Sequence, residues 1–205
     1  MILGWRRPGK VGTARFNISL KLKTWGFFIA KFSMFCKHPY TKSSKSKLKY
    51  ILNKTGDYLK NLKIKIIIFD LIGVLFNKKM AEGTVVYEAY NWALDLVNLA
   101  KKSNYSLFWC SNMSSKSFSQ LRGSFENVFD NFDGGILSDE VGVVKPNPAI
   151  WLTLINKYTL NISEILYLDD QLNNILAARQ LGIISVQVIS EVETKKILNG
   201  LGVLS

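Results

Sequence analysis

Carboxylates follow two apolar stretches of the chain, where they could hold a cation or attack an electrophile. Asp70 ends the nearly continuous apolar run that begins at Ile64, and Asp169 and Asp170 end the run that begins at Ile165. Two adjacent carboxylates repel each other and favour a cation between them. The sequence therefore indicates a cation site near the Asp169–Asp170 pair.

Two further polar positions could belong to the same site. Ser111 and Asn112 end the apolar run that starts at Ser106, and Lys145 lies in the stretch Val-Gly-Val-Val-Lys-Pro-Asn-Pro. Each has a simpler explanation when taken alone: Asp70 and the Ser–Asn pair could cap a helix or turn, and Lys145 could be a surface lysine. Ligands bind at the carboxyl ends of strands in open α/β sheets, so together these positions predict one site built from distant segments.

The apolar runs that carry these residues alternate with helical periods, which is typical of βαβ units around a parallel sheet. We expect strands over residues 64–70, 106–110, 135–137, 165–168 and 184–189. We expect helices over residues 84–102 and 147–157, an alanine-rich helix that follows Asp170 and ends at Leu181, and a last helix after a capping box that begins at Ser190. The predicted fold class is α/β, a three-layer, Rossmann-like parallel sheet with helices on both faces.

The positive charge of the chain is concentrated at one end. Residues 1–56 hold 13 of the 27 Lys and Arg residues and no Asp or Glu, which leaves the remainder with a net charge of −1. We therefore divide the chain into a basic N-terminal arm or targeting segment, residues 1–56, expected to be poorly ordered, and a core domain, residues 57–205.

The basic arm suggests partners of its own. It could bind an anionic membrane surface or nucleic acid, and its acid-free, serine-containing composition also fits an organelle-targeting segment. Its longest apolar stretch, residues 25–36, is too short to span a bilayer. We expect a cytoplasmic protein, with organelle targeting as the alternative.

From about Ile64 to Leu204, the order of four motifs resembles the haloacid-dehalogenase-like hydrolase superfamily, specifically its phosphatase branch. The motifs are Ile-Ile-Ile-Phe-Asp-Leu-Ile-Gly-Val-Leu, Cys-Ser-Asn, Gly-Val-Val-Lys-Pro-Asn-Pro, and Leu-Tyr-Leu-Asp-Asp followed by Ala-Ala-Arg-Gln-Leu-Gly-Ile. The resemblance implies the same α/β fold and a metal-dependent phosphoryl-transfer site.

The resemblance also assigns roles to the carboxylates. Asp70 would be the nucleophile that forms an aspartyl phosphate. The implied cofactor is Mg²⁺, held by Asp70, by the backbone carbonyl of Ile72 and by Asp170, with Asp169 acting directly or through water.

The remaining site residues would bind the substrate, a phosphorylated compound that the sequence does not identify. Ser111 and the backbone N–H of Asn112 would bind the phosphoryl oxygens, and Lys145 would offset the charge of Asp70 and the phosphate.

The sequence departs from the family pattern in two places. Ile72 stands where the family usually has a second Asp, the general acid and base. Only a short stretch separates Leu75 from the helix expected at Thr84, so the helical cap is nearly absent and the site is open. The leading hypothesis is a Mg²⁺-dependent phosphatase or phosphotransferase, a phosphoric monoester hydrolase. The alternative is a catalytically impaired domain that serves as a binding or scaffolding module.

Overall fold

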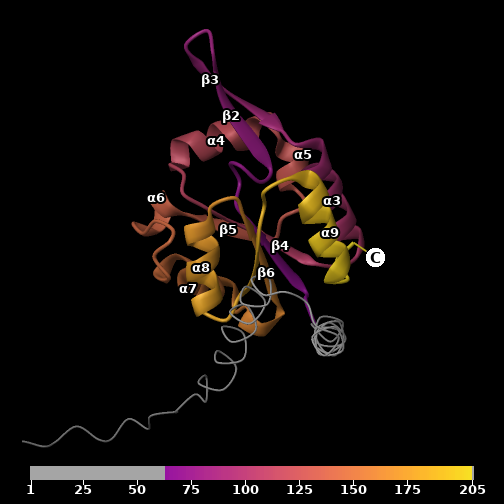
Figure 1. The fold of residues 1–205 in the computed structure, drawn as a ribbon. Helices are drawn as coiled ribbons and strands as arrows, with labels where there is room; N and C mark the ends of the chain where they lie inside the picture. The colour runs from indigo at the N-terminus through magenta and orange to yellow at the C-terminus, as the bar shows by residue number, and fades with distance from the viewer. Residues whose placement is uncertain (1–62, 205) are drawn as a thin grey trace, which may run out of the picture. The chain divides into compact units, whose positions relative to one another are not determined.

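The computed structural model describes residues 63–204, and its main feature is a five-stranded parallel sheet (Figure 1). The strand order is β5-β4-β1-β6-β7, with β1 in the centre. The strands are β1 (Ile66–Phe69), β4 (Ser106–Ser111), β5 (Gly134–Leu137), β6 (Ile165–Asp169) and β7 (Ile184–Gln187). The predicted α/β fold class, with helices on both faces of a parallel sheet, is confirmed.

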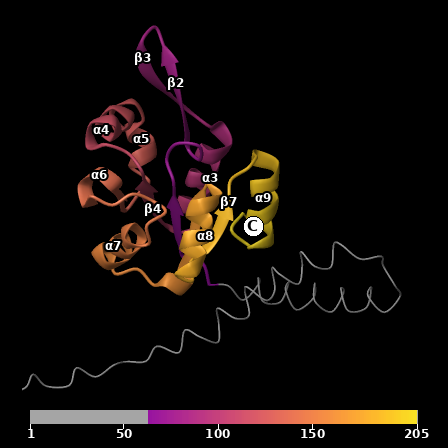
Figure 2. The ribbon, with the colours of Figure 1, turned by 60° about the vertical axis from the view of Figure 1, so that its left-hand side comes forward.

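Alternate residues of the central strand enter two separate cores, one on each face of the sheet. Ile67 and Phe69 pack with the helices of one face, and Ile66 and Ile68 with those of the other. The first core takes buried residues from α3 (Asn91–Lys102), α4 (Ser115–Ser124), α5 (Glu126–Phe129) and α9 (Glu191–Gly200). The second takes them from α7 (Ala149–Tyr158) and α8 (Leu172–Gln180). Figure 2 labels both helices. Two short helices, α6 (Ser138–Val141) and η1 (Ile162–Glu164), precede α7 and β6.

The register of the strands brings the predicted site residues to one edge. Ile66 pairs with Ser106 of β4 and with Ile165 of β6, and all three strands run in parallel. The backbone N–H of Asp70 continues this ladder by donating to the Leu168 carbonyl over 2.8 Å. The carboxyl ends of β1, β4 and β6 therefore lie side by side.

The prediction of a helix over residues 84–102 is wrong for the first third of that range. Residues Phe76–Ala81 (β2) and Thr84–Ala89 (β3) form an antiparallel hairpin, and the helix begins only at Asn91. Glu82 and Gly83 join the strands with φ angles of 50° and 76°, the conformation of a two-residue hairpin turn. The β-branched residues after the turn favour a strand.

This hairpin follows the first motif, in the stretch where the sequence indicates almost no cap. Leu75 and Phe76 at its base are fully buried, and the N–H of Tyr90 donates to the Leu75 carbonyl. Beyond its base the hairpin projects from the sheet (Figures 1 and 2), and Met80 near its tip is 68% exposed.

The basic arm assigned to residues 1–56 lies outside the described residues, so its predicted disorder and its proposed partners stay predictions. Among residues 63–204, none of the helices combines the length and the apolar character needed to cross a bilayer.

Candidate active site

Asp70 leaves the central strand with its carboxylate turned into a group of donors. Its Oδ1 accepts hydrogen bonds from the N–H of Leu71 at 2.7 Å and the hydroxyl of Ser111 at 2.8 Å, and lies 3.0 Å from the Lys145 ammonium. Within the described residues, no group donates to Oδ2. Burial raises the pKa of Asp70, against the opposing effect of Lys145. Donors from the described residues therefore hold one oxygen of the carboxylate and not the other.

Lys145 is a buried cation shared by two carboxylates. Its Nζ lies 3.0 Å from Asp70 Oδ1 and 2.8 Å from Asp169 Oδ2. Burial alone would lower the pKa of Lys145, but the carboxylates of Asp70 and Asp169 outweigh it and raise the pKa. The ammonium therefore stays charged at neutral pH. The reading of Lys145 as an ordinary surface lysine is wrong, because the residue is only 4% exposed.

Asn112 holds the main chain that carries this lysine. Its side-chain Oδ1 accepts from the N–H of Lys145 at 2.7 Å, and its Nδ2 donates to the Lys145 carbonyl at 3.0 Å. The end of β4 thus fixes the loop before α7. The role expected for the Asn112 backbone N–H, binding phosphoryl oxygens, stays a prediction, and its side chain has this second function.

Asp169 is fully buried and accepts hydrogen bonds on both oxygens. Its Oδ2 receives the Lys145 ammonium, the Tyr167 hydroxyl and the amide of Asn174. Its Oδ1 receives the N–H of Gln171 at 2.8 Å and the same Asn174 amide at 3.0 Å. This carboxylate is therefore held in one orientation by protein donors.

Asp170 is the opposite case. Its Oδ1 is buried and has no hydrogen-bond partner among the described residues. Burial, and next the charge of Asp169, raise the pKa of Asp170. A buried carboxylate oxygen without a donor is costly, and such a group in a native protein calls for an explanation such as a bound ion.

The turn after Asp70 leaves room for this carboxylate. Gly73 has a φ of +88°, and a Cβ at this position would lie 2.6 Å from the Cγ and Oδ2 atoms of Asp170. Only glycine adopts this conformation without strain, and only glycine lets the backbone approach so closely. Glycine at position 73 therefore provides the space that the Asp170 carboxylate occupies.

Ile72 lies in the same turn, at the position where the family pattern has a second Asp. Its half-buried side chain packs against the core that contains Phe76 and Leu71. It cannot transfer a proton, whatever its orientation. The expected metal contact through its backbone carbonyl stays a prediction.

The three carboxylates fit a hard divalent cation. Asp70, Asp169 and Asp170 each offer one oxygen within 4.8 Å of the others, and all belong to the edge formed by β1 and β6. Mg²⁺ prefers such oxygen ligands. The Asp170 oxygen that has no donor among residues 63–204 is the observation in favour of the metal.

Cys110, the residue before Ser111, is a fully buried thiol on the face covered by α7 and α8. Burial raises the pKa of Cys110 to about 12. The side chain is therefore protonated at neutral pH, and a buried, protonated thiol is a poor nucleophile.

Sequence reasoning missed three residues of the site. Tyr167 was part of an apolar run and Asn174 part of a helix, and both contact Asp169. Gly73 stood in the first motif without a role. The available signals were a tyrosine two residues before a paired aspartate, which places both on one face of the strand, and a glycine in the turn after the nucleophile.

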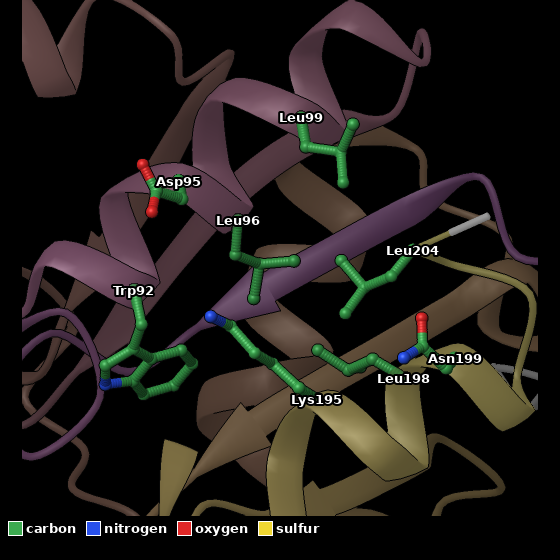
Figure 3. A pocket seen from close by; sticks show the side chains of 8 residues that line it. All are labelled: Trp92, Asp95, Leu96, Leu99, Lys195, Leu198, Asn199 and Leu204. Carbon is green, nitrogen blue, oxygen red and sulfur yellow. The ribbon is translucent and has the colours of Figure 1, made fainter. Parts of the chain in front are cut away.

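A groove elsewhere in the domain contains none of the predicted site residues. It lies between α3 and α9, has a volume of about 310 Å³ and is shown in Figure 3. Its apolar lining comes from Trp92, Leu96, Leu99, Leu198 and Leu204. The predicted site residues lie at the carboxylate edge of the sheet and not in this groove.

Comparison with known proteins finds that this chain is similar to haloacid dehalogenase-like hydrolases. The family model for haloacid dehalogenase-like hydrolase matches residues 87–182. A sesquiterpene phosphatase of Aspergillus oryzae is 24% identical over 99 residues, 48% of this chain. The match spans only 50% of that relative's length.

Solved structures share the fold. An uncharacterized protein of Corynebacterium glutamicum is 23% identical, with a TM-score of 0.54, over 68% of this chain and 96% of its own. A haloacid-dehalogenase-family enzyme of Bacteroides thetaiotaomicron, crystallised with magnesium and inorganic phosphate, is 19% identical. Its TM-score is 0.52, over 60% of this chain and 93% of its own. These neighbours share the fold of this chain, and the family match supports a hydrolase.

Proposed function

We propose that this protein is a Mg²⁺-dependent phosphatase or phosphotransferase that forms an aspartyl phosphate on Asp70. The observation that carries the proposal is the asymmetry of the Asp70 carboxylate. Three donors converge on Oδ1, and within residues 63–204 none reaches Oδ2. A nucleophile needs this arrangement, with one oxygen oriented and the other available.

Asp70 Oδ2 would attack the phosphorus of a phosphate monoester. The new bond joins Oδ2 to phosphorus, the bond from phosphorus to the ester oxygen breaks, and the alcohol leaves as its oxyanion, which takes a proton from water. In a phosphatase, water then cleaves the aspartyl phosphate, releasing inorganic phosphate and restoring Asp70. In a phosphotransferase, another acceptor takes the phosphoryl group.

Lys145 and Ser111 would stabilise the charge that develops during this attack. The Lys145 ammonium lies 3.0 Å from Asp70 and is buried, so its field is poorly screened by water. The Ser111 hydroxyl lies at the same oxygen and could turn toward the phosphoryl group. The Asn112 backbone N–H would add a donor, while its side chain holds Lys145 in place.

The carboxylates of Asp70 and Asp170 would hold the cofactor, with the Ile72 carbonyl as a further ligand. Bound Mg²⁺ would offset the negative charge of the phosphoryl group as the carboxylate approaches it. The Bacteroides neighbour, which was crystallised with magnesium and phosphate, supports the same choice of ion.

Ile72 limits the range of substrates. Without an acid at this position, expulsion of a poorly acidic alcohol would be slow, so aryl and acyl phosphates should react better than alkyl phosphates. Hydrolysis of the aspartyl phosphate should also be slow. The sesquiterpene phosphatase of Aspergillus oryzae supports a phosphatase activity, and it matches only part of this chain.

Ile72 also favours a second candidate, a domain of this fold that binds a ligand without turning it over. Its side chain packs against the apolar core, as a structural residue would. In that case the metal and a phosphorylated ligand would still bind.

The two candidates are separated by phosphate release from a panel of aryl, acyl and alkyl phosphates, with and without Mg²⁺. An enzyme releases phosphate from the aryl and acyl members in a Mg²⁺-dependent reaction that Asp70→Asn abolishes. Release that Asp70→Asn leaves unchanged would contradict the proposed mechanism. Binding of phosphate without any turnover would favour the binding module.

A further inference from the structure

We propose that Tyr167 is a positioning residue that fixes Asp169 as the anchor of Lys145, so that Asp170 alone of the pair ligates the metal. The inference rests on the proposed function. It assigns different tasks to two adjacent aspartates and a task to a tyrosine that the mechanism above does not use.

The hydrogen bonds of Asp169 leave little room for a metal. A carboxylate has about four lone-pair directions, and Asp169 receives donors from four protein groups, one of which reaches both oxygens. To become a metal ligand, Asp169 would have to release the Lys145 ammonium, the Gln171 N–H or the Asn174 amide. Each is a hydrogen bond to a charged group in a buried place, the strongest kind in proteins.

Asp170 has the opposite balance. Its Oδ1 is buried without a donor in the described part of the chain, and its carboxylate faces the glycine turn that follows the nucleophile. Binding a cation there would cost no protein hydrogen bond at Oδ1. The two aspartates therefore differ in whether they can bind a metal without losing a hydrogen bond to the protein.

Tyr167 contacts both members of the anchored pair. Its hydroxyl donates to Asp169 Oδ2, and the Lys145 ammonium lies 5.8 Å from the centre of its ring. The ring is fully buried and meets Trp151 edge-on, with 5.6 Å between ring centres. A buried tyrosine hydroxyl needs a hydrogen-bond partner. The packing of the Tyr167 ring leaves its hydroxyl little freedom to reach a partner other than Asp169.

The consequence is a fixed position for the ammonium. Lys145 Nζ lies 2.8 Å from Asp169 Oδ2 and 3.0 Å from Asp70 Oδ1. If Asp169 were free to turn, the lysine would follow it away from the nucleophile. The Tyr167 hydroxyl prevents this by occupying the same oxygen, and small displacements of charged groups are expensive for catalysis.

The test uses Tyr167→Phe, which keeps the ring and its packing and removes only the hydroxyl. Its matched control is Tyr158→Phe, which removes a half-buried hydroxyl that bonds to Gly135, away from the site. We expect kcat on an aryl phosphate to fall about 10–100-fold in Tyr167→Phe, as for other groups that orient a ligand, with KM within twofold of the parent. Tyr158→Phe should keep its kcat.

A second readout needs no turnover. Mg²⁺ should raise the melting temperature of the parent, of Tyr167→Phe and of Asp169→Asn, and should not raise that of Asp170→Asn. An unchanged kcat in Tyr167→Phe, or loss of the Mg²⁺ response in Asp169→Asn, would overturn the inference. If the parent shows no turnover at all, the proposed function fails, and the melting experiment still decides which aspartate binds the metal.

Discussion

The two sides of the carboxylate cluster differ in how many of their charged and polar atoms have hydrogen-bond or ion-pair partners in the protein. On one side, Lys145, Asp169 and Asn174 form a buried network in which every charged group has a partner. On the other side, Asp170 has a buried oxygen to which no group in the described part of the chain donates, and its carboxylate faces the turn that contains Ile72 and Gly73. The first side can be stable with protein groups alone. The second has a buried oxygen that no donor of residues 63–204 reaches, and this is where a cation and a substrate would bind.

The largest expected effect comes from breaking the satisfied side. Lys145→Met would leave the carboxylates of Asp70 and Asp169 buried together without a cation, which typically costs about 3–5 kcal/mol. The free energy of unfolding, from urea titration at pH 7 with a chelator, should fall by about that amount. In the control Lys79→Met, loss of the exposed ion pair with Glu88 should cost less than about 1 kcal/mol.

The cost of Lys145→Met should also depend on pH. Burial raises the pKa of Asp70, and Lys145 opposes that rise, so the variant would raise the pKa further. A raised pKa means that stability is retained below the unfolded-state value of about 4 and is lost as the pH rises. The difference between variant and parent should therefore grow from pH 4 to pH 7. A constant difference would show that Lys145 acts by packing and not by charge.

The next effect concerns chemistry on the unsatisfied side. Ile72→Asp should raise turnover of alkyl phosphates more than that of aryl phosphates, because a general acid is typically worth about 10²–10⁴ in rate for a poor leaving group. Ile72→Asn is the matched control, since it is polar but transfers no proton. If Ile72→Asp folds and binds Mg²⁺ but gains on neither substrate class, Ile72 is not the limiting defect and the binding module becomes the better account.

A smaller effect should follow from filling the space beside Asp170. Gly73→Ala forces a side chain into a conformation with positive φ and against the Asp170 carboxylate. Gly83→Ala introduces similar backbone strain, but its Cβ would have no neighbouring atom within 4 Å. We expect the control to lose about 1 kcal/mol and Gly73→Ala to lose about 2 kcal/mol or more.

Only Gly73→Ala should also weaken the rise in melting temperature with Mg²⁺. Equal losses of stability and equal metal responses in the two variants would mean that the turn does not shape the metal site.

The smallest expected effect is that of removing residues 1–56. All the strands and helices described above lie in residues 63–204, so the truncated chain should keep a cooperative thermal transition and its Mg²⁺ response. The measurement is a pair of melting curves for the full and truncated chains. A truncated chain without a cooperative transition would make the arm part of the domain. Salt-sensitive binding to anionic vesicles or nucleic acid, lost with the arm, would give the arm a role of its own.

Much of this site could be predicted because parallel strands deliver their carboxyl ends to one edge. That rule alone placed Asp70, Ser111 and Asp169 together, and the structure has them in direct or bridged contact. The contact between the Asn112 side chain and the Lys145 main chain could not be predicted. It depends on how a loop 33 residues further along the chain returns to β4.

The hairpin shows how a periodic pattern can mislead. Val86, Ala89 and Ala93 recur at helical spacings, but the first two belong to β3 and only the third to α3. The available signal was Gly83, because glycine favours the positive φ angle that a two-residue hairpin turn requires. In the structure both Glu82 and Gly83 take positive φ angles. Tyr167 was missed for another reason: its place two residues before Asp169 puts both side chains on one face of the strand, but the spacing alone does not show that the hydroxyl contacts the carboxylate.

The most direct test of the account is to look for a phosphoryl group on Asp70. Because Ile72 cannot activate water, the aspartyl phosphate should persist long enough to trap. After brief incubation with acetyl phosphate and Mg²⁺ and quenching in acid, mass spectrometry should find a phosphoryl increment on the peptide that contains Asp70, and none without Mg²⁺. Absence of the increment in the parent while acetyl phosphate is consumed, or its persistence on the same peptide in Asp70→Asn, would contradict the assignment of Asp70 as the nucleophile.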